Sequence, residues 1–276
     1  MTAEAVATTL QAIRARRPLV HNITNLVVTN STANALLAVG ASPAMVEAAE
    51  EVAEFAAIAD ALVINLGTMS AARAQAMRLA ADAARAAGRP WVLDPVAVGA
   101  IGYRSTVAVG LLDARPQAIR GNASEVIALA RLSGALPADE GDARGGRGVD
   151  SLASADAALE AARLLARTSG AAVVVSGAID YATDGTRMVA IANGHPMMPY
   201  VTGLGCTATA IIGACLAVEP DALAASVHGM VMIGLAGELA GARVSGPGSL
   251  QVALLDALYT LDTRTIIALA RLKPIA

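Results

Sequence analysis

The 276-residue chain is rich in aliphatic side chains: 55% of its residues are hydrophobic but only 2% are aromatic, and its mean hydropathy is +0.57. With a net charge of −3 and Lys and Arg scattered along the sequence, it lacks the basic stripe that nucleic acid or an anionic membrane would require. No purely apolar run reaches the roughly 18 residues of a membrane span; the closest, 227–242, contains His228 and Glu238. So much apolar surface predicts burial between subunits, as in a homo-oligomer.

The N-terminal segment 1–18 carries an acidic residue early and a basic cluster late, which is the reverse of a secretory signal. We therefore expect a cytoplasmic protein. The next segment, 18–45, contains no Asp, Glu, Lys or Arg, but it holds His21, four Asn and several Thr and Ser. Polar, uncharged side chains among apolar ones are typical of a pocket for a small neutral ligand. They are equally typical of a buried polar network whose hydrogen bonds are satisfied.

Short β-branched runs recur around residues 61, 90 and 171, with the sequences ALVINLGT, PWVLDPVA and AAVVVSGA, and turn residues end each of them. Uninterrupted runs of this kind predict parallel strands covered on both faces. The segments 71–88 and 151–168 have apolar residues at helical spacing. Strand and helix therefore alternate, and the predicted class is α/β.

The glycine-rich, charged stretch 137–151 interrupts this alternation. It is read as an exposed loop rather than a linker, because strand and helix signals continue beyond it. The chain is therefore expected to form one domain over 1–276. After Cys206 it is expected to be helical almost to its end, with breaks at Pro220, 246–248 and Pro274.

Ligands of doubly wound α/β proteins bind where the strands end. The stretch GLGC, residues 203–206, opens a predicted helix whose free N–H groups and dipole would stabilise a phosphoryl group. At this place the pKa of the Cys206 thiol is expected to fall, which makes it a candidate base for a substrate hydroxyl. A turn followed by a small buried Cys would have the same pattern, and Cys215 is interpreted in that way. The two thiols, about 13 Å apart on one helix, are too distant for a disulfide.

Three further places follow predicted strands. Asn122 with Glu125 three residues later has the spacing of a helix capping box. Glu125 is also a candidate to hold, through water, a Mg²⁺ on nucleotide phosphates that Arg120 would reach with its planar guanidinium. Asp94, before Pro95, is a turn residue or a second contributor to the water shell of that metal.

The last of these places is the turn after AAVVV. Backbone N–H groups at Ser176 and Gly177, and at a second turn over 183–185, are candidates to receive phosphate or nucleotide. A plain tight turn explains the same residues.

Several motifs occur together in order from Pro18 to about Tyr259. They are HNITN, VTNSTANALLAVGASPAM, NLGT, WVLDPVAVGAIGYR, AIRGNASEV, RGVDS, VVVSGAIDYATDG and GLGCTATA. In combination they resemble the hydroxyethylthiazole kinase family of thiamine salvage.

The resemblance implies a ribokinase-like fold, with a central, mostly parallel sheet flanked by helices on both faces in three α/β/α layers. It also implies a homotrimer with active sites between subunits. The implied reaction is ATP- and Mg²⁺-dependent phosphorylation of the primary hydroxyl of 4-methyl-5-(2-hydroxyethyl)thiazole.

Matching motifs carry the family's site residues onto this chain. Substrate would be bound by Met45, Gly203, Asn25 and Gly67, ATP by Arg120 and Ser176, and magnesium by Asp94 and Glu125, with Cys206 at the position of the catalytic base. The sequence departs from the family pattern at Asn22, where relatives often have Cys, and at Leu204, where they have Thr. Leu204 removes a hydroxyl near the phosphate, but the backbone N–H groups that form the anion hole remain.

Three other functions stay open. Hydroxymethylpyrimidine kinase, a relative in fold, also places Cys after a glycine-rich turn but lacks the HNITN and GASPAM segments. A nucleotide-dependent hydrate dehydratase, which is a lyase, would be expected to keep Asp at the position of Cys206. A binding protein for thiazole or nucleotide without turnover is suggested only by Leu204.

Overall fold

The computed structural model describes residues 1–137 and 151–275, with side chains of 151–155 left out. In this part of the chain nine strands form a single sheet, in the order β2-β1-β3-β4-β5-β6-β7-β8-β9. The strands are β1 (Leu19–Ile23), β2 (Ser42–Ala44), β3 (Ala61–Asn65), β4 (Trp91–Asp94), β5 (Ala118–Asn122), β6 (Ala172–Ser176), β7 (Asp180–Thr183), β8 (Met188–Ile191) and β9 (Leu272–Ile275). The first six are parallel, and the last three add antiparallel to one edge.

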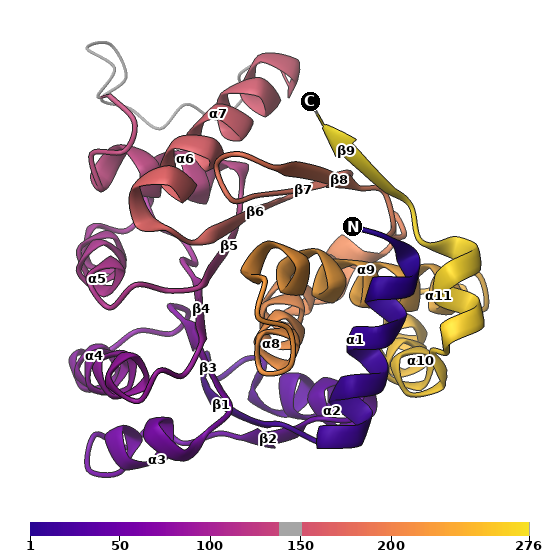
Figure 1. The fold of residues 1–276 in the computed structure, drawn as a ribbon, viewed down its shortest axis with the longest axis horizontal. Helices are drawn as coiled ribbons and strands as arrows, with labels where there is room; N and C mark the ends of the chain where they lie inside the picture. Colours follow the sequence, from indigo (N-terminus) through magenta and orange to yellow (C-terminus); the bar gives the residue numbers. More distant parts are fainter. Residues whose placement is uncertain (138–150, 276) are drawn as a thin grey trace.

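Helices cover both faces of this sheet, as Figure 1 shows. One layer consists of α3 (Val52–Ile58), α4 (Ala71–Ala86), α5 (Gly102–Leu112), α6 (Ala123–Leu132) and α7 (Ser151–Ser169). The other consists of α1 (Ala3–Arg16), α2 (Thr29–Val39), α8 (Leu204–Leu216), α9 (Ala222–Gly241), α10 (Pro247–Thr260) and α11 (Thr263–Leu269), with a short 3-10 helix, η1 (Met198–Tyr200), before α8. Each layer has its own cluster of buried aliphatic side chains against the sheet. The predicted three-layer α/β/α class is confirmed.

Most predicted elements are confirmed within a few residues. The three β-branched runs form β3, β4 and β6, and the two helical segments form α4 and α7. As predicted, the chain after Cys206 is helical almost to its end, in α8 to α11, and the helices stop before Pro274. Strand β9 was not predicted: the residues around Pro274 pair with β8. Proline lacks an N–H group, so it is tolerated there on an edge strand. The stretch 137–151, predicted to be a loop, lies almost entirely outside the described residues.

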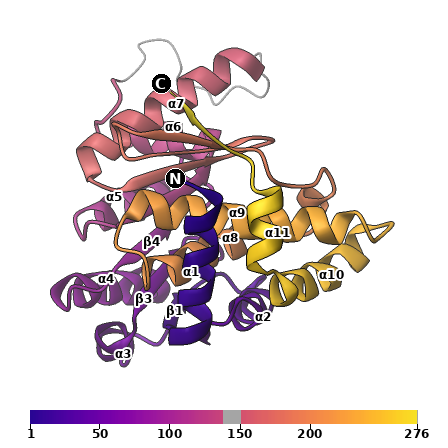
Figure 2. The same ribbon diagram turned by 45° about the vertical axis from the view of Figure 1, so that its right-hand side comes forward.

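Helix α9 is the one helix of the described ranges that is long and apolar enough to cross a membrane, with a mean hydropathy of 1.5 over its most apolar stretch. However, 83% of that stretch is buried within the fold. It packs against α8 and α10, and α1 lies across α8 and α9 (Figure 2). His228, which interrupts its apolar sequence, accepts or donates a 2.8 Å hydrogen bond to Thr9 of α1. The length and hydropathy of α9 are therefore those of a core helix.

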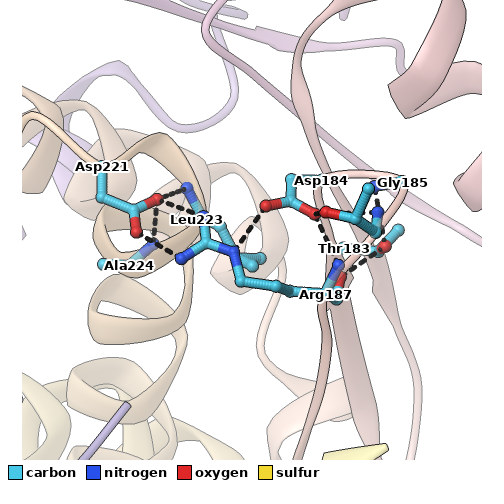
Figure 3. Close-up of polar contacts among 8 residues, drawn as sticks. Thr183, Asp184, Gly185, Arg187, Asp221, Leu223 and Ala224 are labelled. Atoms are coloured by element: carbon cyan, nitrogen blue, oxygen red, sulfur yellow. Dashed lines mark hydrogen bonds and ion pairs between the residues drawn. The ribbon is translucent and has the colours of Figure 1, made fainter. Parts of the chain in front are cut away.

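The turn at 183–185 and the turn after β6 lie at opposite ends of the strands, because β7 runs antiparallel to β6 and Thr183 pairs with Val173, near the start of β6. The prediction that this turn receives phosphate or nucleotide together with Ser176 is therefore wrong. Instead Asp184 accepts hydrogen bonds from Arg187, whose guanidinium also reaches Asp221 (Figure 3). The pair Arg187–Asp221 is bidentate, at 2.7 and 3.0 Å.

Replacing Asp221 by alanine is expected to lower the free energy of unfolding by about 1.5 kcal/mol, since it removes the N-cap of α9 as well as the partner of Arg187. The hydrogen bond from Arg187 lowers the pKa of Asp221. A lowered folded-state pKa means that this stability is present above the ordinary Asp value of about 3.9 and is lost as the pH falls through the folded value. Urea unfolding at pH 7 and pH 3 measures both effects.

Asp262 offers the matched control, because it caps α11 through Thr265 and forms no ion pair with any described residue. Asp262→Ala should cost only the cap, about 1 kcal/mol. Equal losses in the two variants would show that Arg187 contributes no stability.

Candidate active site

The site is built where the parallel strands end. Strand order reverses at β1, which lies between β2 and β3, and a crevice is expected at such a point. Asn25 follows β1, while Asn65 and Asp94 are the paired last residues of β3 and β4. Next along this edge come Arg120 in β5 and Ser176 at the end of β6. The fold therefore brings together residues that are far apart in the sequence.

Two glycines shape the start of α8. Gly203 is the N-cap, with a φ of 80°, and a Cβ added to it would lie 2.1 Å from Cγ1 of Val28. Gly205 gives room to Arg120, since its Cβ would lie 2.5 Å from Nη1 of that side chain. The guanidinium therefore packs directly against the positive end of α8.

Among the described residues no carboxylate forms an ion pair with Arg120, although its charge acts on Asp94 and Asp180 and lowers the pKa of each. Its buried Nε makes no hydrogen bond, and no ion pair holds its guanidinium within the described residues. A cation against a helix N-terminus places two positive charges together, which an anion between them would stabilise. The arrangement is that of an anion-binding site.

A pocket of about 810 Å³ opens in front of Arg120. Ser176, Gly203, Leu204 and Gly205 line it together with Arg120. Three of these five, Arg120, Ser176 and Gly203, are predicted site residues, and Leu204 is the departure from the family pattern. Its other walls come from residues between β6 and β7, from 193–202 and from α9. At this size it accommodates a nucleotide-sized ligand.

Three of the four substrate residues predicted by motif, Met45, Asn25 and Gly67, lie outside the lining of this large pocket. Asn25 is buried and in contact with Gly67, whose added Cβ would lie 2.5 Å from Cβ of Asn25. Met45 is half-buried beyond the end of β2, at the edge of the sheet. Gly203 alone of the four substrate residues lines the large pocket.

Cys206 lies in the first turn of α8, half-buried, and accepts a 3.3 Å hydrogen bond from Nδ2 of Asn25. Burial raises the pKa of the Cys206 thiol, and the nearby charge of Asp94 raises it further. The expected lowering of this pKa is therefore wrong, because desolvation outweighs the donors and Arg120. Cys215 is a fully buried free thiol of the core, as predicted.

Asp94 is fully buried, and its Oδ2 accepts hydrogen bonds of 2.8 Å from Asn65 and from Thr209. Burial raises the pKa of Asp94 to about 6, although Arg120 and the two donors oppose this. The charge of Glu125 also raises it. A Cβ added to Gly121 would lie 3.3 Å from Oε2 of Glu125 and 3.4 Å from Cγ of Pro95, so the carboxylate of Glu125 lies close to the residue that follows Asp94.

Glu125 is a capping residue, as its spacing predicted. Its Oε2 accepts the N–H of Asn122 and its Oε1 that of Ala97, both at 2.9 Å. Each oxygen keeps a lone pair, so the cap leaves Glu125 able to reach a hydrated cation.

The donor set fits Mg²⁺. No group of three or more His, Cys, Asp or Glu side chains arranged for a metal occurs in the described residues. Mg²⁺ on nucleotide phosphates is usually held by only one or two carboxylates and keeps its waters. Asp94 and Glu125, two neighbouring carboxylates beside an anion site, provide such a set.

The turn after β6 is organised by a residue that the sequence did not single out. Gly177 donates its N–H to Oδ1 of Asp180 at 2.9 Å, and Ser176 donates its hydroxyl to the carbonyl of Gly121. Asp180 lines the large pocket, and burial raises its pKa to about 6. Asn65 and Thr209 were also missed, since an amide in a strand and a hydroxyl in a helix give no pattern.

The uncharged segment 18–45 contributes buried polar groups. Nε2 of His21 lies 2.8 Å from the carbonyl of Val46, and Asn22 donates its amide to the carbonyl of Val20. Nδ1 of His21 and Oδ1 of Asn22 have no partner among the described residues. The donors and acceptors of this buried polar network are thus only partly satisfied.

Comparison with known proteins agrees with this geometry. The model of the hydroxyethylthiazole kinase family matches residues 10–264. A hydroxyethylthiazole kinase of Granulibacter bethesdensis is 66% identical, with 95% of this chain and 92% of that protein aligned. One of Tolumonas auensis is 49% identical, with 96% and 97% aligned.

Solved structures show the same fold. The hydroxyethylthiazole kinase of Pyrococcus horikoshii superimposes with a TM-score of 0.89 at 38% identity, covering 98% of this chain and 99% of that one. A pyridoxal kinase of Staphylococcus aureus in complex with AMP-PCP has a TM-score of 0.63 at 13% identity, covering 93% and 98%. The fold is therefore ribokinase-like, and the protein is a kinase of that class. Within that class, the chain belongs to the hydroxyethylthiazole kinase family.

Replacing Gly205 by alanine is expected to raise the KM for ATP about tenfold. The added methyl group meets the mobile end of Arg120, so the guanidinium must move while the backbone remains as it is. Steady-state kinetics measure the KM for ATP, and a melting curve checks that the melting temperature is unchanged because the backbone remains in place. Gly248, in the first turn of α10, has nothing within 4 Å of an added Cβ, and Gly248→Ala should change neither quantity. A KM that rises equally in both variants would contradict the steric explanation.

Proposed function

We propose that this protein transfers the γ-phosphoryl group of ATP to the primary hydroxyl of 4-methyl-5-(2-hydroxyethyl)thiazole, with Mg²⁺ as cofactor, in thiamine salvage. The observation that carries the proposal is the guanidinium of Arg120, which packs against the N-terminus of α8 without an ion pair among the described residues and lines a nucleotide-sized pocket. Gly205, the residue before Cys206, lines the same pocket. The relatives named above support the choice of acceptor.

In this proposal the residues at the carboxyl ends of the parallel strands have separate roles. Arg120 and Ser176 hold ATP, and Asp94 and Glu125 hold hydrated Mg²⁺, which when bound neutralises charge on the phosphates. Met45, Gly203, Asn25 and Gly67 form the contacts with the thiazole. The backbone N–H groups at the start of α8 and the guanidinium stabilise the transferred group.

Cys206 orients the hydroxyl and accepts its proton as the new P–O bond forms. Phosphoryl transfer has a loose transition state, so positioning matters more than early removal of this proton. The sulfur must be a thiolate at that moment. Asn25 and Arg120 favour the thiolate, while burial and Asp94 oppose it.

The direct test is ATP-dependent phosphate transfer to hydroxyethylthiazole, with hydroxymethylpyrimidine as a parallel acceptor and Mg²⁺ omitted as a control. Selective, metal-dependent formation of the thiazole phosphate is expected. Preference for the pyrimidine would identify the other kinase. Tight binding of thiazole without product would indicate a binding protein, and Leu204→Thr would then be the first reversion to make.

We further propose a single domain over 1–276 that forms a cytoplasmic homotrimer with its active sites between subunits. Large apolar side chains lie exposed beside the substrate residues: Leu26 and Val27, directly after Asn25, are 67% and 65% exposed. A neighbouring subunit would cover them and complete the wall around the thiazole. Light scattering after size exclusion should give three times the chain mass of 27.6 kDa.

A further inference from the structure

Buried side-chain hydrogen bonds connect Asp94 to Cys206. Oδ2 of Asp94 accepts from Nδ2 of Asn65 at 2.8 Å, and Oδ1 of Asn65 accepts from Nδ2 of Asn25 at 2.9 Å. Nδ2 of Asn25 in turn donates to Sγ of Cys206 at 3.3 Å. Asn65 is completely buried and Asn25 is only 6% exposed, so water does not compete for these bonds.

Backbone groups fix the direction in which each amide donates. The N–H of Gly67 donates to Oδ1 of Asn65 at 2.9 Å, and the N–H of Val27 donates to Oδ1 of Asn25 at 3.1 Å. A backbone N–H group can only donate, so both oxygens are placed without ambiguity. The amide nitrogens must then face Asp94 in one case and Cys206 in the other.

This order of donors makes the sulfur an acceptor. Because Nδ2 of Asn25 donates to Sγ, the proton of the thiol cannot point at Asn25. In the thiol that proton points away from the two amides, and in the thiolate a lone pair of the sulfur does. A donor held at the sulfur stabilises the thiolate more than the thiol. The charged groups that also act on Cys206 are Asp94, which opposes the thiolate, and Arg120, which favours it.

We propose that Asn65 is a positioning residue for phosphoryl transfer: it holds the amide of Asn25 so that Nδ2 donates to Cys206 and keeps the sulfur ready to receive the substrate's proton. This role rests on the proposed function for its consequence in catalysis. The contact itself exists in the free enzyme and can be measured there.

The test is Asn65→Leu, which keeps most of the side-chain volume and removes the three hydrogen bonds of the Asn65 side chain, with Asp94, Asn25 and the N–H of Gly67. In metal-free buffer at pH 8 without substrates, alkylation of Cys206 by iodoacetamide is expected to slow about fivefold. Cys215 is fully buried, and Cys206→Ser provides the blank. In the kinase assay kcat should fall about tenfold, while the KM for ATP stays within about twofold because Asn65 does not line the nucleotide pocket.

Thr209→Val is the matched control, since it removes the other side-chain donor to Asp94 and leaves Asn65 and Asn25 in place. Its alkylation should not slow. Slowing equal to that of Asn65→Leu would assign the effect to Asp94 and overturn the proposal, as would alkylation of Asn65→Leu at the wild-type rate. If Asn65→Leu does not fold, as judged by its melting curve, Asn65→Ser is measured with the same criteria. An enzyme inactive on thiazole would refute the proposed function and leave the alkylation result standing.

Discussion

Replacing Arg120 by alanine is expected to lower kcat/KM for ATP about a thousandfold, the range of arginines that stabilise phosphoryl transfer. The guanidinium lines the pocket beside the N-terminus of α8, and no ion pair holds it in the part of the chain that the structure describes. Its removal breaks no ion pair among the described residues, but it takes away a charge that favours ionised Asp94 and Asp180, so the melting temperature should stay unchanged or fall slightly. Steady-state kinetics and calorimetric titration with ATP measure the loss.

Arg120→Lys separates charge from shape. Lysine keeps the charge but has no planar fork, so it should recover only part of the activity. Full activity in the lysine variant would reduce the role of Arg120 to charge alone. Tight ATP binding in the alanine variant would place the nucleotide elsewhere.

Cys206→Ala is expected to lower kcat about a hundredfold with little change in the KM for either substrate, which is the low end of the effect of losing a general base. The loose transition state limits the loss, because little proton transfer has occurred when the barrier is crossed. Rapid quench of a single turnover would separate chemistry from product release.

Cys215→Ala is the internal control, since this thiol lies in the same helix but in the core. It should cost some stability and leave kcat unchanged. A Cys206→Ser variant that kept the full kcat would refute the role of Cys206 as proton acceptor.

Much of the fold was predictable because parallel strands buried on both faces leave uninterrupted β-branched runs, as at β3, β4 and β6. The cap formed by Asn122 and Glu125 was predictable because it depends on residues three apart. Strand β9 was not, because its pairing with β8 joins residues some eighty positions apart, and Pro274 argues locally against a strand.

The candidate site also contains residues that could be predicted from the sequence and properties that could not. Motifs indicated Arg120, Ser176 and Gly203, which the structure brings to one pocket. The direction of the Cys206 pKa was mispredicted because helix position is visible in the sequence, whereas burial and the nearness of Asp94 depend on packing. Asn65 was missed for the same reason, since its partners come from three separate strands and loops.

Strand β9 has a consequence for the order in which the protein is completed. Just before it, Arg271 donates its N–H to Oδ1 of Asn193 at 2.8 Å, and its side chain reaches Glu238, which also accepts from Gly194. Asn193 and Gly194 line the pocket of about 810 Å³ in front of Arg120. During synthesis from the N-terminus, this wall stays unsupported until residue 271 has left the ribosome. Protection of a nascent chain by ATP should therefore begin only once Arg271 is free to dock against Asn193 and Glu238.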